Sequence, residues 1–209
     1  MTLESKEAEE GGILEFSPPD LEKLTGAQGG YKLEMLDGNS LFELIERGLI
    51  IEINDDELRA ELLGVGSERA HKSRVAYARN PDRLTLVDDS LNHPLNQQDR
   101  IVASAVKKEI ERLDLGAVSG GISRLADWAT IILKHYQRTK AALFNTDGPY
   151  IVTRTGVLED KLKGVEDSVA IFKQVGPNKI AIATQTRDEG AYDVVAAPLL
   201  FPKAGIQTM

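Results

Sequence analysis

The side chains best suited to proton transfer in this 209-residue sequence are its three histidines, His71, His93 and His135. No two of them have the spacing at which a helix presents a pair of metal ligands, so the sequence contains no zinc motif. His93 lies between Asn92 and Pro94 in a polar segment, where a functional loop residue could sit. His135 belongs to a segment with helical apolar spacing, and we expect it to be a helix-surface or hydrogen-bonded core residue.

Three short acidic clusters could bind a divalent cation through carboxylate oxygens. They contain Asp55, Asp56 and Glu57, then Asp88 and Asp89, then Asp188 and Glu189. The first cluster is explained by capping of a helix N-terminus, and the alternating acidic pattern of a calcium loop is absent. Asp88 and Asp89 could join His93 in a site with oxygen ligands, but a solvated loop is the simpler interpretation. The sequence therefore predicts no metal, no cofactor and no catalytic residue.

Two glycine-containing segments match nucleotide-binding fingerprints only in part. The sequence Gly-Val-Gly-Ser at 64–67 lacks the third small residue of a dinucleotide loop, because Arg69 occupies that position. Residues 116–121 hold three glycines but no Gly-Lys-Ser/Thr, and the chain has no Gly-x-Ser-x-Gly elbow of a hydrolase. We interpret both segments as turns at helix ends.

Composition narrows the classes of function and location. A formal net charge of −8 argues against general binding to nucleic acids or anionic membranes. The absence of cysteine excludes disulfides, thiolate nucleophiles and cysteine-based metal sites. No apolar run approaches the ~20 residues needed to cross a bilayer, and residues 1–12 are acidic where a secretion signal would be basic. We therefore expect no membrane partner and a cytoplasmic location, or a virion if the protein is viral.

The clearest helix is predicted over residues 121–145. Its apolar side chains recur at three- and four-residue steps around Trp128, which we expect to be buried at the centre of the fold. Ser123 can cap the start of this helix. A second helix is predicted over 96–113, and the short glycine-containing connection between the two favours a helical hairpin spanning 96–145.

The remaining segments predict an α/β or α+β domain over residues 31–197. Residues 31–63 alternate between strand and helix patterns, and residues 150–197 are rich in strand patterns. We expect the helical hairpin to pack on a mainly antiparallel sheet drawn from 150–197. A flexible acidic N-terminal arm (1–30) and an extended C-terminal tail (198–209) are expected to flank this domain.

The tail and one basic helix face are the predicted interfaces. The tail carries four apolar side chains between and beyond two prolines: Leu199, Leu200, Phe201 and Ile206. Each would forgo about 1.5–3 kcal/mol of burial if left in water, which indicates a partner. Lys134 and Arg138 could pair with the acidic arm of a neighbouring copy. The alternative is that the tail folds back onto its own sheet as an edge strand.

These patterns favour a non-enzymatic structural subunit of a large homomeric assembly, such as a phage-like virion or a contractile-tail component. Its partners would be copies of itself or other assembly subunits. One alternative is a small cytoplasmic α/β enzyme with a loop-built site, which a deep pocket containing His93 or Asp88 would favour. The other is a cytoplasmic adaptor or regulator that docks through its C-terminal tail.

Overall fold

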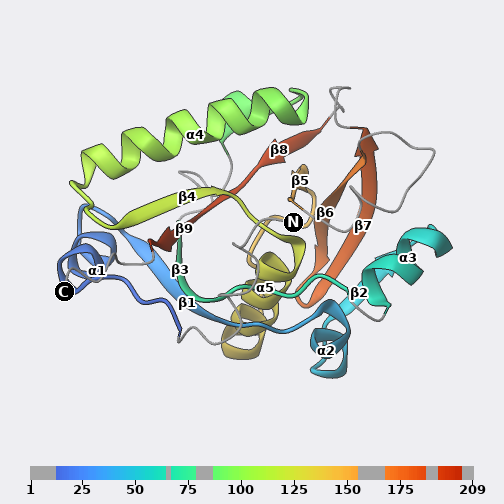
Figure 1. Ribbon diagram of the computed structural model, residues 1–209. Coiled ribbons are helices and arrows are strands. Elements are labelled where there is room, and N and C mark those ends of the chain that lie inside the picture. The colour runs from blue at the N-terminus through green and yellow to red at the C-terminus, as the bar shows by residue number, and fades with distance from the viewer. Residues whose placement is uncertain (1–12, 65–66, 79–86, 155–167, 187–192, 204–209) are drawn as a thin grey trace, which may run out of the picture.

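The computed structural model describes residues 13–64, 67–78, 87–154, 168–186 and 193–203 (Figure 1). The first half contains α1 (Pro18–Thr25), β1 (Tyr31–Asp37), α2 (Leu41–Glu46), β2 (Ile50–Ile53), α3 (Asp56–Leu63) and β3 (Lys72–Ala78). The second half contains a 3₁₀ turn (Asp88–Ser90), α4 (Leu95–Arg112), β4 (Val118–Ile122), α5 (Leu125–Thr139), β5 (Tyr150–Val152), β6 (Ser168–Gly176), β7 (Lys179–Thr186), β8 (Val194–Ala196) and β9 (Pro198–Pro202). No helix among the described residues is long and apolar enough to cross a membrane.

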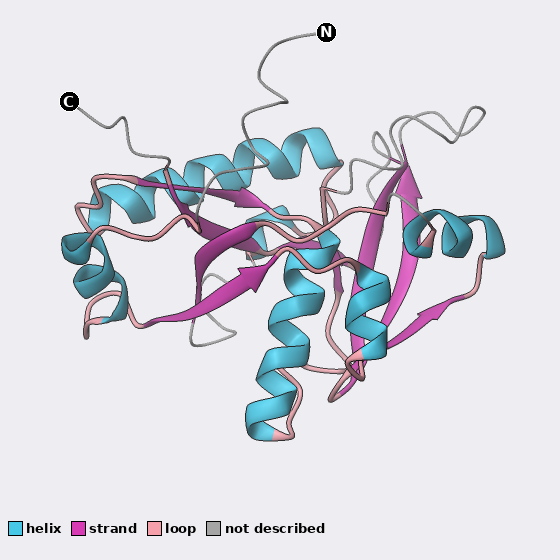
Figure 2. Cartoon of the chain, turned by 60° about the horizontal axis from the view of Figure 1, so that its bottom comes forward, coloured by secondary structure: helices cyan, strands magenta, loops and turns pink. Residues whose placement is uncertain are grey.

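The strands form two sheets that lie side by side (Figures 1 and 2). The four-stranded sheet has the order β1-β3-β9-β4 and is antiparallel throughout. The five-stranded sheet has the order β2-β7-β6-β5-β8, in which β2 pairs with β7 and β5 pairs with β8 in parallel. The predicted mixed α/β class with mainly antiparallel pairing is therefore confirmed.

The helices divide the core into two parts, one on each face of the four-stranded sheet. Because successive side chains of a strand point to opposite faces, Leu199 belongs to the same core cluster as Trp128 of α5, and Leu200 belongs to the cluster that contains Val102 of α4. Trp128 has no exposed surface, as predicted, and its ring lies 5.2 Å from that of Phe144. α4 and α5 thus lie on opposite sides of one sheet (Figure 1).

This arrangement corrects the expected helical hairpin over 96–145. Strand β4 stands between the two helices and carries the chain from one face of the sheet to the other. Its sequence, Val-Ser-Gly-Gly-Ile, buries Val118 and Ile122 at alternating positions. The strand period was hidden because two of its five residues are glycines, which carry no side chain to mark a face.

The expected helix over 121–145 is also shorter than predicted. α5 begins at Leu125, where Asp127 accepts the backbone N–H of Arg124 at 3.2 Å, and Ser123 does not serve as the N-cap residue. The helix ends at Thr139, because Lys140 adopts a left-handed conformation with φ of 59°.

The prediction of an extended C-terminal tail is also wrong for residues 198–202. Residues 198–202 form β9, an interior strand between β3 and β4 rather than an arm. Leu199 and Leu200 are 0% and 3% exposed, so the burial that indicated a partner is provided by the chain's own core. This corresponds to the alternative in which the tail folds back, although as an interior rather than an edge strand. Ile206 lies outside the described residues.

Part of the expected N-terminal arm is docked on the fold. Ser17 caps α1, and Asp20 on that helix accepts the backbone N–H groups of Gly116 and Ala117 at 2.8 and 3.2 Å. Lys23 forms an ion pair with Asp114 at 2.8 Å. These contacts attach α1 to the turn that leads into β4. Residues 1–12 of the expected arm lie outside the described part of the chain.

Candidate functional site

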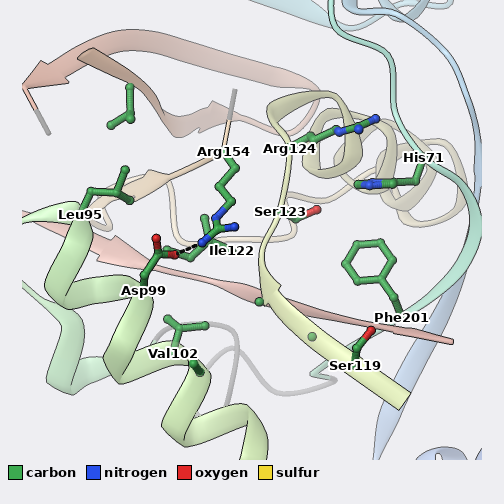
Figure 3. A pocket seen from close by; sticks show the side chains of 14 residues that line it. His71, Leu95, Asp99, Val102, Ser119, Ile122, Ser123, Arg124, Arg154 and Phe201 are labelled. Atoms are coloured by element: carbon green, nitrogen blue, oxygen red, sulfur yellow. Dashed lines mark ion pairs between the residues drawn. The ribbon is translucent and has the colours of Figure 1, made fainter. Parts of the chain in front are cut away.

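A cleft of about 610 Å³ follows β4, the last strand in the order of the four-stranded sheet (Figure 3). Its walls come from α4, the start of α5, β9 and the residues that follow β5. The polar and charged side chains that line it are His71, Asp99, Ser119, Ser123, Arg124 and Arg154. The cleft therefore collects residues that are up to 130 positions apart in the sequence, from 71 to 201.

The two glycines of β4 shape the part of the cleft that borders this strand. Gly120 faces the core on the α4 side, where an added Cβ would lie 2.6 Å from Leu200 Cδ2 and 2.8 Å from the Leu199 carbonyl oxygen. Gly121 lines the cleft, and a Cβ there would meet nothing within 4 Å. Both glycines therefore line the cleft, but only Gly120 is also required for close packing of β4 against β9.

The most specific polar arrangement in the cleft is a histidine held by a buried carboxylate. Asp127 has no exposed surface, and its Oδ2 lies 2.8 Å from Nδ1 of His71. Its Oδ1 accepts the backbone N–H of His71 at 2.8 Å. The hydroxyl of Ser123 donates to the same carboxylate, as does the backbone N–H of Arg124. A buried carboxylate with this many donors meets the requirement that a buried charge be hydrogen-bonded.

The contact with Asp127 fixes the chemistry of the imidazole. With the carboxylate ionised, Nδ1 of His71 carries the donated proton, and Nε2 is left as the proton acceptor of the ring. The imidazole is 38% exposed and lies against Phe201, with ring centroids 5.0 Å apart. The contact resembles the histidine–carboxylate pair of a catalytic triad, in which the carboxylate sets the tautomer and stabilises the imidazolium.

Two arginines add positive charge along the cleft. The Arg124 guanidinium donates to the Arg69 carbonyl oxygen at 3.1 Å, at the same end of the cleft as His71. Arg154 lies at the other end, where its Nη2 pairs with Oδ1 of Asp99 on α4 at 2.7 Å (Figure 3). The backbone of residues 119–123 runs between these two ends in the same view.

The site differs from the one that the sequence favoured. His93 contacts Gln97 at 2.9 Å and does not line the cleft. Asp89 borders a separate, smaller depression beside α4, and the side chain of Asp88 is not described. The histidine of the cleft is His71, which no sequence pattern singled out, because its partner Asp127 lies 56 residues away.

The predicted basic interface residues are paired within the chain. Lys134 contacts Asp37 at 2.7 Å and the Met35 carbonyl oxygen at 2.6 Å. Arg138 forms an ion pair with the buried Glu34. Both side chains therefore connect α5 to β1, and their contact with another copy stays a prediction.

His135 agrees with the expectation of a core histidine, because it is only 9% exposed. Burial lowers its pKa, and the nearby positive charges of Lys32 and Arg138 lower it further. It lies on the core side of α5, among the buried residues of that helix.

No known protein family, curated protein or solved structure matches this sequence. Within the described ranges, no group of three histidine and acidic side chains could hold a metal ion.

Proposed function

We propose that this chain is an enzyme that uses His71 as a general base to hydrolyse a small ester bound in the cleft beside β4. The observation that supports it is the buried Asp127 carboxylate, 2.8 Å from Nδ1 of a half-exposed imidazole that lines the cleft. A base in a concave site, oriented by a third group, is the usual signature of acid–base catalysis.

In the proposed reaction, Nε2 of His71 takes a proton from a water molecule while the water oxygen attacks the ester carbonyl carbon. The resulting oxyanion lies at the end of the cleft where Arg124 supplies positive charge. His71 then returns the proton to the alcohol oxygen as the carbon–oxygen bond breaks. Water and ester become acid and alcohol, and Asp127 stabilises the intermediate imidazolium.

Water is the proposed nucleophile because the serine nearest to the dyad is otherwise engaged. The Ser123 hydroxyl donates its proton to Asp127, the same carboxylate that holds His71, and its exposed fraction is only 2%. A serine nucleophile would instead donate to the imidazole.

The test compares His71→Asn with the native chain, using 4-nitrophenyl acetate as the ester. An asparagine amide can donate to Asp127 from near the position of Nδ1 but cannot act as a base at neutral pH. We expect the catalysed rate to fall by about 10²–10⁴-fold, the usual contribution of a general base. Thermal unfolding of the variant should remain close to that of the native chain. Hydrolysis at the native rate by a folded His71→Asn variant would contradict the proposal.

As a second candidate, we propose that the chain is a structural subunit of a homomeric assembly. Support comes from Phe42 on α2 and Ile50 on β2, which are 51% and 49% exposed. β2 is an end strand of the five-stranded sheet, and such strands can pair with another chain.

The second candidate is tested by the mass of the chain in solution at two concentrations. A large species that Ile50→Lys dissociates would favour the assembly, because a charge on an end strand opposes pairing. A concentration-independent monomer would contradict it.

A further inference from the structure

We propose that the substrate of this cleft is an extended ester that ends in an anion, and that Arg154 binds this end after its ion pair with Asp99 opens. The anion is a carboxylate or a phosphate, which share the oxygen geometry that a guanidinium recognises. The inference rests on the proposed function for the reacting end of the substrate. The anion site itself rests on separate contacts.

The first observation is the exposure and geometry of the Arg154–Asp99 pair. The two side chains are 60% and 32% exposed, and Arg154 Nη2 lies 2.7 Å from Asp99 Oδ1. An exposed pair of this kind contributes little to stability, so an incoming anion can displace it at low cost. A two-point contact between the guanidinium and a carboxylate or phosphate is stronger and more directional.

The second observation is that the backbone of Arg154 is fixed while its side chain reaches across the cleft. Its N–H donates to the Ser123 carbonyl oxygen at 2.9 Å, and Ser123 is itself bonded to Asp127. The residue that holds the anion is therefore attached to the segment that positions His71.

The third observation is that one cleft contains both ends. The charged pair and His71 lie on either side of the β4 backbone in Figure 3, and Gly121 lines the cleft between them. A side chain at this position would occupy open space rather than the core. The cleft, at about 610 Å³, lies within the range of about 300–1,000 Å³ that holds a small organic ligand.

The anion site is tested by binding, without any reaction. Inorganic phosphate and sodium acetate are titrated separately at constant ionic strength, and the arginine Nε–H signals are followed by ¹H–¹⁵N NMR. Asp99→Asn should tighten binding by about two- to fivefold, because it removes an internal competitor of the strength of an exposed ion pair. Arg154→Gln should abolish the response.

The matched control is Glu52→Gln on β2, which removes one negative charge from an ion pair with Lys179 outside the cleft. If Asp99→Asn binds the anion more tightly and Glu52→Gln does not, Asp99 competes locally with the anion for Arg154. Equal effects of the two variants, or native affinity in Arg154→Gln, would overturn the proposal. The stronger response to phosphate or to acetate identifies which anion the site prefers.

The length of the substrate is tested with two esters of 4-nitrophenol, acetate and glutarate, which differ by a terminal carboxylate. We expect kcat/KM for the glutarate ester to be roughly tenfold higher or more, as for a hydrogen bond to a charged group. Arg154→Gln and Gly121→Leu should both lower this ratio. An unchanged ratio in both variants would overturn the inference even if His71-dependent hydrolysis is present. If neither ester is hydrolysed through His71, the proposed function fails, and the phosphate titration still decides the anion site.

Discussion

At the scale of single residues, buried carboxylates have the most demanding roles in this molecule. Asp127 positions His71 and also accepts the backbone N–H of Arg124, the residue that caps α5, so it serves the site and the helix together. Asp20 holds α1 against the turn before β4. Both are buried, and each replaces lost water with several hydrogen bonds.

Replacing Asp127 with asparagine should destabilise the fold. The amide keeps the size of the side chain but has one acceptor oxygen in place of two, so buried donors lose a partner. We expect the free energy of unfolding to fall by about 1–3 kcal/mol, the cost of leaving a buried donor unsatisfied. Urea denaturation of this variant beside His71→Asn measures the difference, and equal stability of the two would contradict a structural role for the carboxylate.

The second residue-scale prediction concerns the pH dependence of stability through Asp20. Burial alone would raise the pKa of this carboxyl, but hydrogen bonds from Ser17 and from the Gly116 and Ala117 N–H groups lower the pKa below its ordinary value. A lowered pKa in the folded state adds stability that is present above the unfolded pKa of about 3.9 and lost as the pH falls through the folded value.

Asp20→Asn should therefore reduce the loss of stability below about pH 4, relative to the native chain. Urea denaturation at several pH values between neutral and strongly acidic measures this slope. An identical slope in the two proteins would show that the Asp20 contacts contribute nothing to stability in solution.

At the scale of elements, β4 carries two adjacent glycines with opposite roles. Gly120→Ala should destabilise the fold by about 1–3 kcal/mol, because its Cβ would overlap Leu200 and the Leu199 carbonyl. Gly121→Ala should be neutral or stabilising by up to about 1 kcal/mol, because its Cβ enters open space and the unfolded chain loses freedom. Thermal unfolding of the two variants gives the comparison. The reverse order of stability would mean that the β4–β9 register differs from the one described.

At the scale of the whole molecule, β8 and β9 connect the two sheets. They are separated by Ala197 alone, so residues 194–202 pass from the edge of the five-stranded sheet to the interior of the four-stranded sheet. β9 also contributes Leu199 to one part of the core and Leu200 to the other. The last described strand is thus central to both cores.

Deleting residues 198–209 should consequently abolish cooperative unfolding, because it separates β3 from β4 and removes apolar side chains from both cores. The matched single substitution is Leu199→Ala. It should lower the free energy of unfolding by about 2–5 kcal/mol, as for other buried leucines. Circular dichroism during heating measures both. A shortened chain that keeps its thermal stability and loses only an oligomeric contact would restore the interface role of the tail.

Features that depend on neighbouring residues were predictable from the amino-acid sequence. The spacing around Trp128 predicted a buried helix, since side chains three and four positions apart share one face. The strand patterns within 150–197 likewise predicted a mainly antiparallel sheet, in which β6 and β7 form an antiparallel pair. These signals are local, because backbone geometry links each residue to the next few along the chain.

The site and the position of the C-terminal strand could not be predicted, because both depend on contacts between distant segments. Asp127 is near the start of a helix in any fold, but its contact with His71 requires a chain reversal over 56 residues. The apolar tail needed burial, and the sequence did not distinguish a partner from the chain's own sheet. The hydrophobic effect favours any arrangement that removes these apolar side chains from water. Which surface covers them depends on how distant strands, here β3 and β4, are placed in the fold.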